Sequence, residues 1–218
     1  MNWTDSLAEH SNRSIAAQVR RLTLSSLPAD ADLTLVQSLI HGGAIDDMVL
    51  MRASGVAYVR FISGDACDKY CENYQNGLNF RYKGRLHTAF VDKGTEVDII
   101  SGMLQGYIDC GASRCVCAIG ADEDWSMGGL KILAEGKSRK GKVENITDVY
   151  RNGVSRPTGH YLFELADSLQ IRTIVFRFTS ISEAVTFKAM LTRDEDWEAC
   201  NVQFAADPCE RANGVHLE

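Results

Sequence analysis

Hydrophobic and polar residues alternate along residues 54–61, which is typical of a β-strand with one buried and one displayed face. This strand is the best-defined element of the first half of the chain. One side of it holds Ala57, Val59 and Phe61, and the other holds Val56, Tyr58 and Arg60. We expect the first group in a hydrophobic core and the second on an open sheet surface.

The flanking residues predict a complete βαββαβ unit over residues 19–93. The strand that begins at Arg21 ends at Pro28, because proline cannot donate to a ladder. Asp30 or Asp32 caps the first helix, and Ser63 caps the second. The remaining expected elements are a strand over residues 45–51 and a hairpin around the Lys83-Gly84 turn, whose second arm, from Arg85 to Val91, is the last strand. This order is that of the ferredoxin-like split βαβ fold.

Residues 94–111 predict a helical linker. Residues 95–98 have the form of a capping box, and apolar residues follow at helical spacing from Val97 to Ile108. An apolar stripe has to be covered, so we expect this helix to dock on a sheet face or between the two halves and to fix their relative orientation.

The remaining sequence predicts a second copy of the unit over residues 112–210. Residues 59–63 parallel residues 176–180, and a Ser-led helix follows each segment. The second copy carries a long insert, residues 151–171, with the apolar residues Tyr161 and Phe163. Residues 1–18 read as a polar tail or short helix, and residues 211–218 as a tail. The fold class is therefore α+β, with two ferredoxin-like βαββαβ domains joined by a helical linker.

Composition and charge narrow the function classes. The 218-residue chain has 45% hydrophobic and 24% charged residues, as in ordinary globular proteins. It has no apolar run of the roughly 18 residues that a membrane helix needs and no signal-peptide pattern, so we expect an intracellular protein without membrane contact. The net charge of −6 argues against bulk electrostatic binding of nucleic acid.

Candidate chemistry for an enzyme or a metal site is weak. The chain lacks the P-loop, GxSxG and HExxH motifs, so no catalytic residue and no enzyme activity is predicted. Its seven cysteines lack paired CxxC spacing, and none of its five histidines stands at a zinc-knuckle spacing to a cysteine. We therefore expect reduced thiols, no metal and no cofactor.

The strand at residues 54–61 resembles the longer signature strand of the RNA recognition motif. Gly55, Ala57, Tyr58, Val59 and Phe61 match that signature, whereas Ser54 replaces its leading base and Val56 its first outward aromatic. Residues 22–27 resemble the shorter signature strand, with Thr23 where an aromatic would stack. The segments 111–114 and 202–209 resemble the way in which fungal tandem proteins of this family enter and leave their second domain.

The resemblance implies base stacking at outward positions of each sheet. These positions are Thr23, Val56 and Tyr58 in the first copy, and Cys117, Thr173 and Val175 in the second. One of the six is aromatic, and a stacked base contributes about 1–3 kcal/mol. We therefore expect weak or selective binding of single-stranded RNA, centred on the first sheet. The expected location is nuclear or cytoplasmic, with the nucleus favoured.

Two sets of residues are candidates for contacts. For RNA we name Tyr58 with Thr23, Val56, Arg60 and Arg52 on the first sheet, and Lys137, Arg139 and Lys140 in a basic run that is either a phosphate track or a solvated loop. Tyr58 itself is either a stacking platform or a plain exposed strand tyrosine. For a protein partner or self-association we name Cys117, Val175, Arg177, Tyr161 and Phe163. This second set defines the alternative function, a degenerate recognition motif that binds protein and no RNA.

Overall fold

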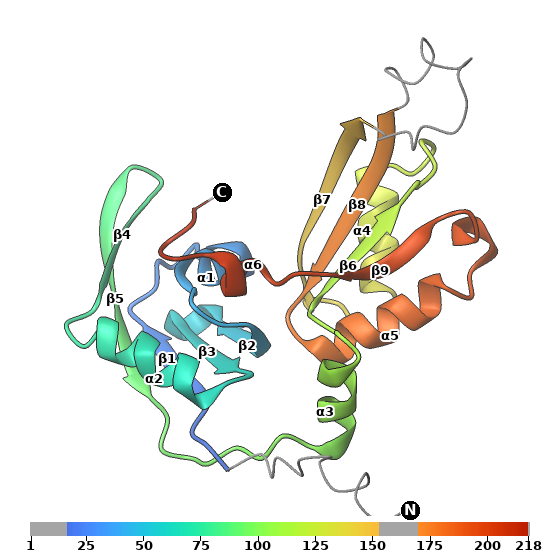
Figure 1. Cartoon of the computed structure of the whole chain (residues 1–218). Helices are drawn as coiled ribbons and strands as arrows, with labels where there is room; N and C mark the ends of the chain where they lie inside the picture. The colour runs from blue at the N-terminus through green and yellow to red at the C-terminus, as the bar shows by residue number, and fades with distance from the viewer. Residues whose placement is uncertain (1–16, 153–169, 218) are drawn as a thin grey trace, which may run out of the picture.

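The computed structural model of the chain describes residues 17–152 and 170–217, and these residues form two α+β domains side by side (Figure 1). The expectations for residues 1–16 and for most of the insert, with Tyr161 and Phe163, lie outside the described residues. None of the described helices combines the length and apolar character that a membrane crossing requires.

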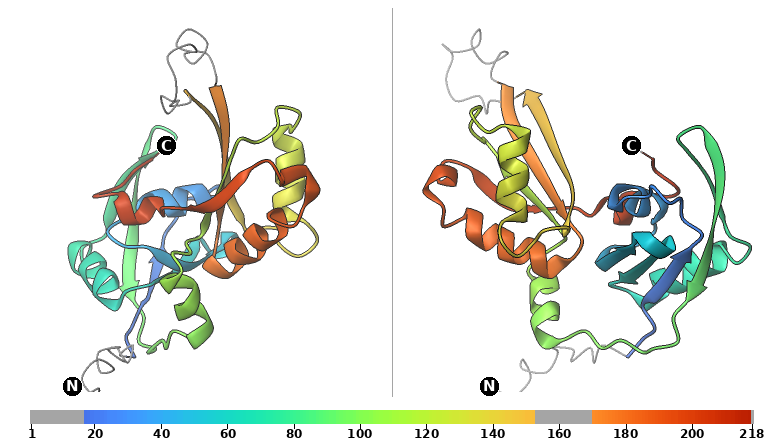
Figure 2. Two further views of the ribbon diagram at one scale, coloured as in Figure 1. Left: turned by 45° about the vertical axis from the view of Figure 1, so that its right-hand side comes forward. Right: turned by 180° about the vertical axis from the view of Figure 1, so that it is seen from behind.

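The first domain is a five-stranded antiparallel sheet with order β2-β3-β1-β5-β4. Two helices cover one of its faces (Figure 2). Its elements are β1 (Arg21–Ser25), α1 (Leu33–Leu39), β2 (Ile45–Met51), the 3-10 turn η1 (Arg52–Ser54), β3 (Val56–Phe61), α2 (Gly64–Asn73), β4 (Leu78–Tyr82) and β5 (Arg85–Lys93). Asp32 and Ser63 are the N-caps of α1 and α2, as the sequence predicts.

The second domain repeats this plan with a four-stranded sheet of order β7-β8-β6-β9. Its elements are β6 (Cys115–Ile119), α4 (Met127–Glu135), β7 (Val143–Asn152), β8 (Gln170–Phe178), α5 (Ile181–Leu191), the 3-10 turn η3 (Glu195–Trp197) and β9 (Asn201–Ala205). In both domains the first and third strands of the unit are central neighbours, which confirms the expected fold class of two ferredoxin-like βαββαβ domains.

Each domain buries its own hydrophobic core between sheet and helices. Ala57, Val59 and Phe61 of β3 lie in the first core with Tyr70 of α2. Ile174, Phe176 and Phe178 of β8 lie in the second, where Phe187 of α5 packs between the two phenylalanines. The alternation read from the sequence is therefore confirmed on the buried side of both central strands.

The linker contains a helix, but this helix begins later than the sequence predicts. Helix α3 spans Gly102–Asp109 and is capped by Ser101, so the proposed capping box at residues 95–98 lies before the helix, in non-helical chain. Its acidic residues pair with Arg21 instead, Asp98 at 2.7 Å and Glu96 at 3.2 Å. Helix α3 packs on α5, where Tyr107 lies among residues of that helix.

The segment after β9 returns to the first domain. Figure 1 shows it crossing from β9 to α1, where it forms the short helix α6 (Pro208–Arg211). Cys209 is fully buried in the core of the first domain, and its carbonyl accepts from the Gly43 amide. Residues 206–217 thus pack with the first domain, although the sequence places residues up to 210 with the second.

Candidate nucleic-acid interface

The face of the first sheet that is not covered by helices displays its side chains in rows across the strands. One row pairs Thr23 of β1 with Tyr58 of β3, and Tyr58 with Val49 of β2. The next row on the same face lies two residues along the strands. In it Met51 of β2 pairs with Val56 of β3, and Ser25 of β1 pairs with Phe90 of β5. Sequence positions Thr23, Val56 and Tyr58 are thus brought onto one surface, as expected.

Two aromatic rings project from this surface. Tyr58 is 53% exposed and Phe90 of β5 is 51% exposed, with β1 lying between their strands. The sequence reading missed Phe90, because it considered only the two signature strands. The alternation in β5, where buried Ala89 precedes Phe90 and the inward-facing Val91 follows it, contains the signal that would have found it.

The two arginines beside Tyr58 are already engaged by carboxylates. Arg60 lies 2.6 Å from Asp46 and 3.9 Å from Asp47, and Arg21 pairs with Asp98. The hydrogen bond to Asp98 raises the pKa of Arg21. A hollow of about 440 Å³ beside Tyr58 is lined by both arginines and also by Asp47 and Glu96. The surface therefore offers rings and apolar side chains more readily than free positive charge.

The other candidate RNA contacts lie elsewhere. Arg52 of η1 is exposed but faces a groove between the domains and does not line the hollow beside Tyr58. Lys137 and Lys140 are exposed. Arg139 is wrong as a ligand candidate, because it is buried against the ring of Phe187 and donates to the Ala134 carbonyl at 2.7 Å.

The equivalent face of the second sheet is different in character. Cys117 pairs in register with Val175, and Ile119 with Thr173. Cys117 and Thr173 are buried, Val175 is half-buried, and none of the outward residues described on this sheet is aromatic. Arg177, expected on the surface, is buried 3.3 Å from Glu144, which corrects that prediction. The linker helix does not cover this face, since α5, on which it packs, lies on the other side of the sheet.

Both domains contain the same ionic triad around a buried carboxylate. In the first, Asp46 at a bulge of β2 lies between Arg20, which precedes β1, and Arg60 of β3. In the second, Glu144 at a bulge of β7 lies between Arg114, which precedes β6, and Arg177 of β8. The extra residue of a bulge turns a side chain out of the regular alternation, here toward two arginines.

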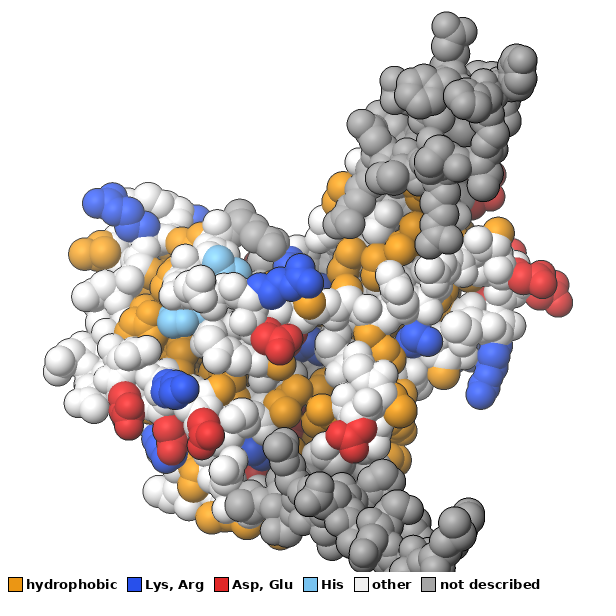
Figure 3. Space-filling model, in the orientation of Figure 1, with side chains coloured by type: hydrophobic (Ala, Val, Ile, Leu, Met, Phe, Trp, Pro, Cys, Tyr) orange, Lys and Arg blue, Asp and Glu red, His pale blue; other side chains and the backbone are white. Residues whose placement is uncertain are grey.

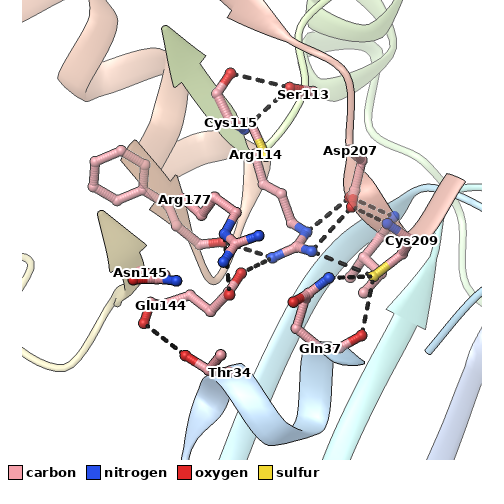
Figure 4. A network of polar contacts seen from close by, with 12 residues as sticks. Thr34, Gln37, Ser113, Arg114, Cys115, Glu144, Asn145, Arg177, Asp207 and Cys209 are labelled. Carbon is pink, nitrogen blue, oxygen red and sulfur yellow. Dashed lines mark hydrogen bonds and ion pairs between the residues drawn. The ribbon is translucent and has the colours of Figure 1, made fainter. Parts of the chain in front are cut away.

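In the second domain this triad extends across the domain boundary (Figure 4). Arg114 donates to both carboxylate oxygens of Asp207 at 2.7 and 2.9 Å, and its Nη2 also lies 3.4 Å from Cys209 Sγ. Asp207 in turn accepts from the backbone of Ile45 at 3.2 Å. Burial lowers the pKa of Arg114, but Asp207 and Glu144 outweigh it and hold that pKa well above its usual value.

A groove of about 920 Å³ runs between the two domains, from α1 and β2 on one side to α4 and β7 on the other. The surface is hollowed between the two domains in the space-filling view (Figure 3). Arg52, Lys131, Lys140 and Lys142 line this interdomain groove. None of the groups of Cys, His, Asp and Glu within the described ranges is arranged to hold a metal ion, and none of the seven cysteines, all of which are described, forms a disulfide.

No protein-family model and no curated protein matches this chain. Among solved structures, the three N-terminal RNA binding domains of the yeast splicing factor Prp24 align with 87% of this chain and 67% of their own, at 15% identity and a TM-score of 0.28. The C. elegans NONO-1 homodimer aligns with 89% of this chain and 65% of its own, at 14% identity and a TM-score of 0.29. The chain thus spans about two thirds of each. Because these scores are low, the fold assignment rests on the strand order and register described above.

Proposed function

We propose that the first domain binds single-stranded RNA weakly on its open sheet face, with Tyr58 and Phe90 as stacking platforms. The observation that supports this most directly is the exposure of two rings, each more than half accessible, on the open face of the five-stranded sheet. The strands of Tyr58 and Phe90 are separated by one other strand, and Phe90 lies two residues further along. The Cα atoms of the two residues therefore stand roughly 12 Å apart, and each ring has room for its own base.

The same surface explains why the affinity is modest. Arg21 and Arg60 have carboxylate partners, and a phosphate group would compete with Asp46, Asp98 and Glu96 for them. Among the described residues, the sheet of the second domain contributes no ring to such a platform. Stacking on two rings, at about 1–3 kcal/mol each, is the main favourable contribution on this surface.

The test is a titration of fluorescein-labelled single-stranded RNA pools by anisotropy. Tyr58→Ala and Phe90→Ala are each expected to weaken binding by about 1–3 kcal/mol, which is roughly fivefold to 150-fold. Tyr150→Ala is the matched control, because Tyr150 is a strand tyrosine of similar exposure, 48%, on β7 of the second domain. Unchanged affinity in both sheet variants would refute the proposal.

A protein-binding function is the second candidate, and the apolar side chains around Tyr58 favour it. Met51 is 51% exposed and Val49 37%, and both belong to the rows described above. An apolar surface of this kind is also suited to a protein partner or to a second copy of the chain. Light scattering over a range of concentrations distinguishes self-association, which Tyr58→Ala and Met51→Ala would weaken, from RNA binding by a monomer.

A further inference from the structure

The interdomain groove carries positive charge that the folded chain leaves unused. Arg52 comes from the first domain, and Lys131, Lys140 and Lys142 come from the second. None of these four side chains forms an ion pair or a hydrogen bond with another described residue, unlike Arg21 and Arg60 on the sheet face. The two domains together therefore build a cationic site that neither has alone.

The acidic residues of the groove offset this charge only in part. Asp32 accepts the Leu35 amide as the N-cap of α1, and Glu144 is held between two arginines. Glu135 of α4 is the remaining carboxylate in the lining. With Glu144 neutralised by its own partners, four cations face two carboxylates, which leaves the groove net positive.

The groove and the hollow beside Tyr58 meet at one strand. Val49 of β2 lines both of them, and β2 is the edge strand of the first sheet. A strand of nucleic acid that stacks on Tyr58 can therefore pass over β2 and enter the groove. Arg52, directly after β2, stands at the start of that path.

We propose that the interdomain groove holds the phosphates of the same single-stranded RNA whose bases stack on the first sheet. The groove supplies the charge neutralisation that the sheet lacks, through Arg52, Lys131, Lys140 and Lys142. This rests on the proposed function, since the RNA enters the groove from the sheet. The proposal assigns the phosphate contacts of the second domain to residues at α4 and at the edge strand β7. The open sheet face of that domain takes no part.

The experiment compares a short and a long single-stranded RNA, of about 4 and about 12 nucleotides, on matched variants. Lys131→Gln with Lys140→Gln removes two exposed groove lysines. Lys69→Gln with Lys83→Gln removes two exposed lysines outside the groove and changes the net charge equally. Affinities are measured between 0.05 and 0.5 M salt, because each lost phosphate contact lowers the logarithmic salt slope by about 0.7 for a single strand.

The groove variant is expected to bind the long RNA with a salt slope reduced by about 1.4, equivalent to about 25-fold in affinity per tenfold change in salt. The short RNA, which reaches only the sheet, is expected to be unaffected. The control variant should leave the salt slope for the long RNA as in the wild type. The proposal would be overturned if the groove variant and the wild type had equal salt slopes for the long RNA. It would also be overturned if the groove and control variants lost equal affinity.

The same data separate this proposal from the proposed function. If the groove variant keeps the wild-type salt slope while Tyr58→Ala weakens RNA binding, RNA binds the sheet alone. A groove effect without sensitivity to Tyr58→Ala or Phe90→Ala would mean that the groove binds RNA and that the sheet proposal is wrong.

Discussion

Arg60 and Arg177 occupy equivalent positions in the two domains, and each pairs with a carboxylate at a bulge of the neighbouring strand. Such a pairing decides which charged side chains remain for a ligand. Alternation alone places both arginines on the open side of the sheet, which is how the sequence reading chose them. Their partners, Asp46 and Glu144, lie at irregularities that alternation does not reveal, so the burial of Arg177 was not predictable. Tyr58 and Val56 need no such partner, so alternation alone was enough to predict their placement on the open face.

Asp207 is the residue whose charge matters most to the link between domains. We expect Asp207→Asn to lower the free energy of unfolding by about 3–5 kcal/mol, because Arg114 is fully buried and would lose a bidentate partner. Urea denaturation followed by circular dichroism measures this. Asp30→Asn, which breaks a surface pair with Lys83, should cost far less. Similar losses in the two variants would contradict the importance of the buried pair.

At the scale of elements, local signals placed most of the structure. Ser63, Ser126 and Ser180 each cap the helix that follows, and the strands begin and end within a few residues of the expected positions. The predicted linker helix was placed too early. Residues 95–100 are not helical, because Asp98 forms a backbone bridge with Gln18 and both acidic residues pair with Arg21, 75 residues or more away in sequence. Tertiary ion pairs of that kind outweigh a local capping signal.

Gly55 joins η1 to β3 and so sets the position of the strand that carries Tyr58. Its φ is +62°, and a Cβ there would lie 2.8 Å from the Leu27 carbonyl oxygen. Gly84 has a similar φ of +79° but open space around it. We expect Gly84→Ala to cost about 1–2 kcal/mol from the left-handed backbone alone. Gly55→Ala should cost at least about 1 kcal/mol more, because Leu27 must also shift. Thermal unfolding of the two variants gives the difference, and equal costs would contradict the close contact.

At the scale of the whole molecule, the two domains are joined by more than their linker. Arg114, Asp207 and Cys209 form the buried contact described above, and the Met48 amide donates to the Thr179 carbonyl at 2.9 Å across the boundary. The sequence indicated two domains and a connecting helix, but nothing in it indicated that residues after β9 return to the first core. That return depends on distant partners, which no local pattern encodes.

These contacts predict that the domains tumble as one body. Nitrogen-15 relaxation should give the same ratio of longitudinal to transverse rates for strand amides of both sheets, since the buried pair and the returning segment span the boundary. Asp207→Asn is expected to make the two sets of ratios diverge. Different ratios in the unmodified chain would show that the contacts do not hold the domains together.

The return of residues 206–217 also has a consequence for synthesis on the ribosome. Domains usually fold in order as the chain emerges, the N-terminal one first. Here Cys209 fills the first core, and Gly42 and Gly43 donate to carbonyls of the returning segment. The first domain therefore stays incomplete while the second is being made, and its last gap closes only after the segment that follows the second domain has left the exit tunnel.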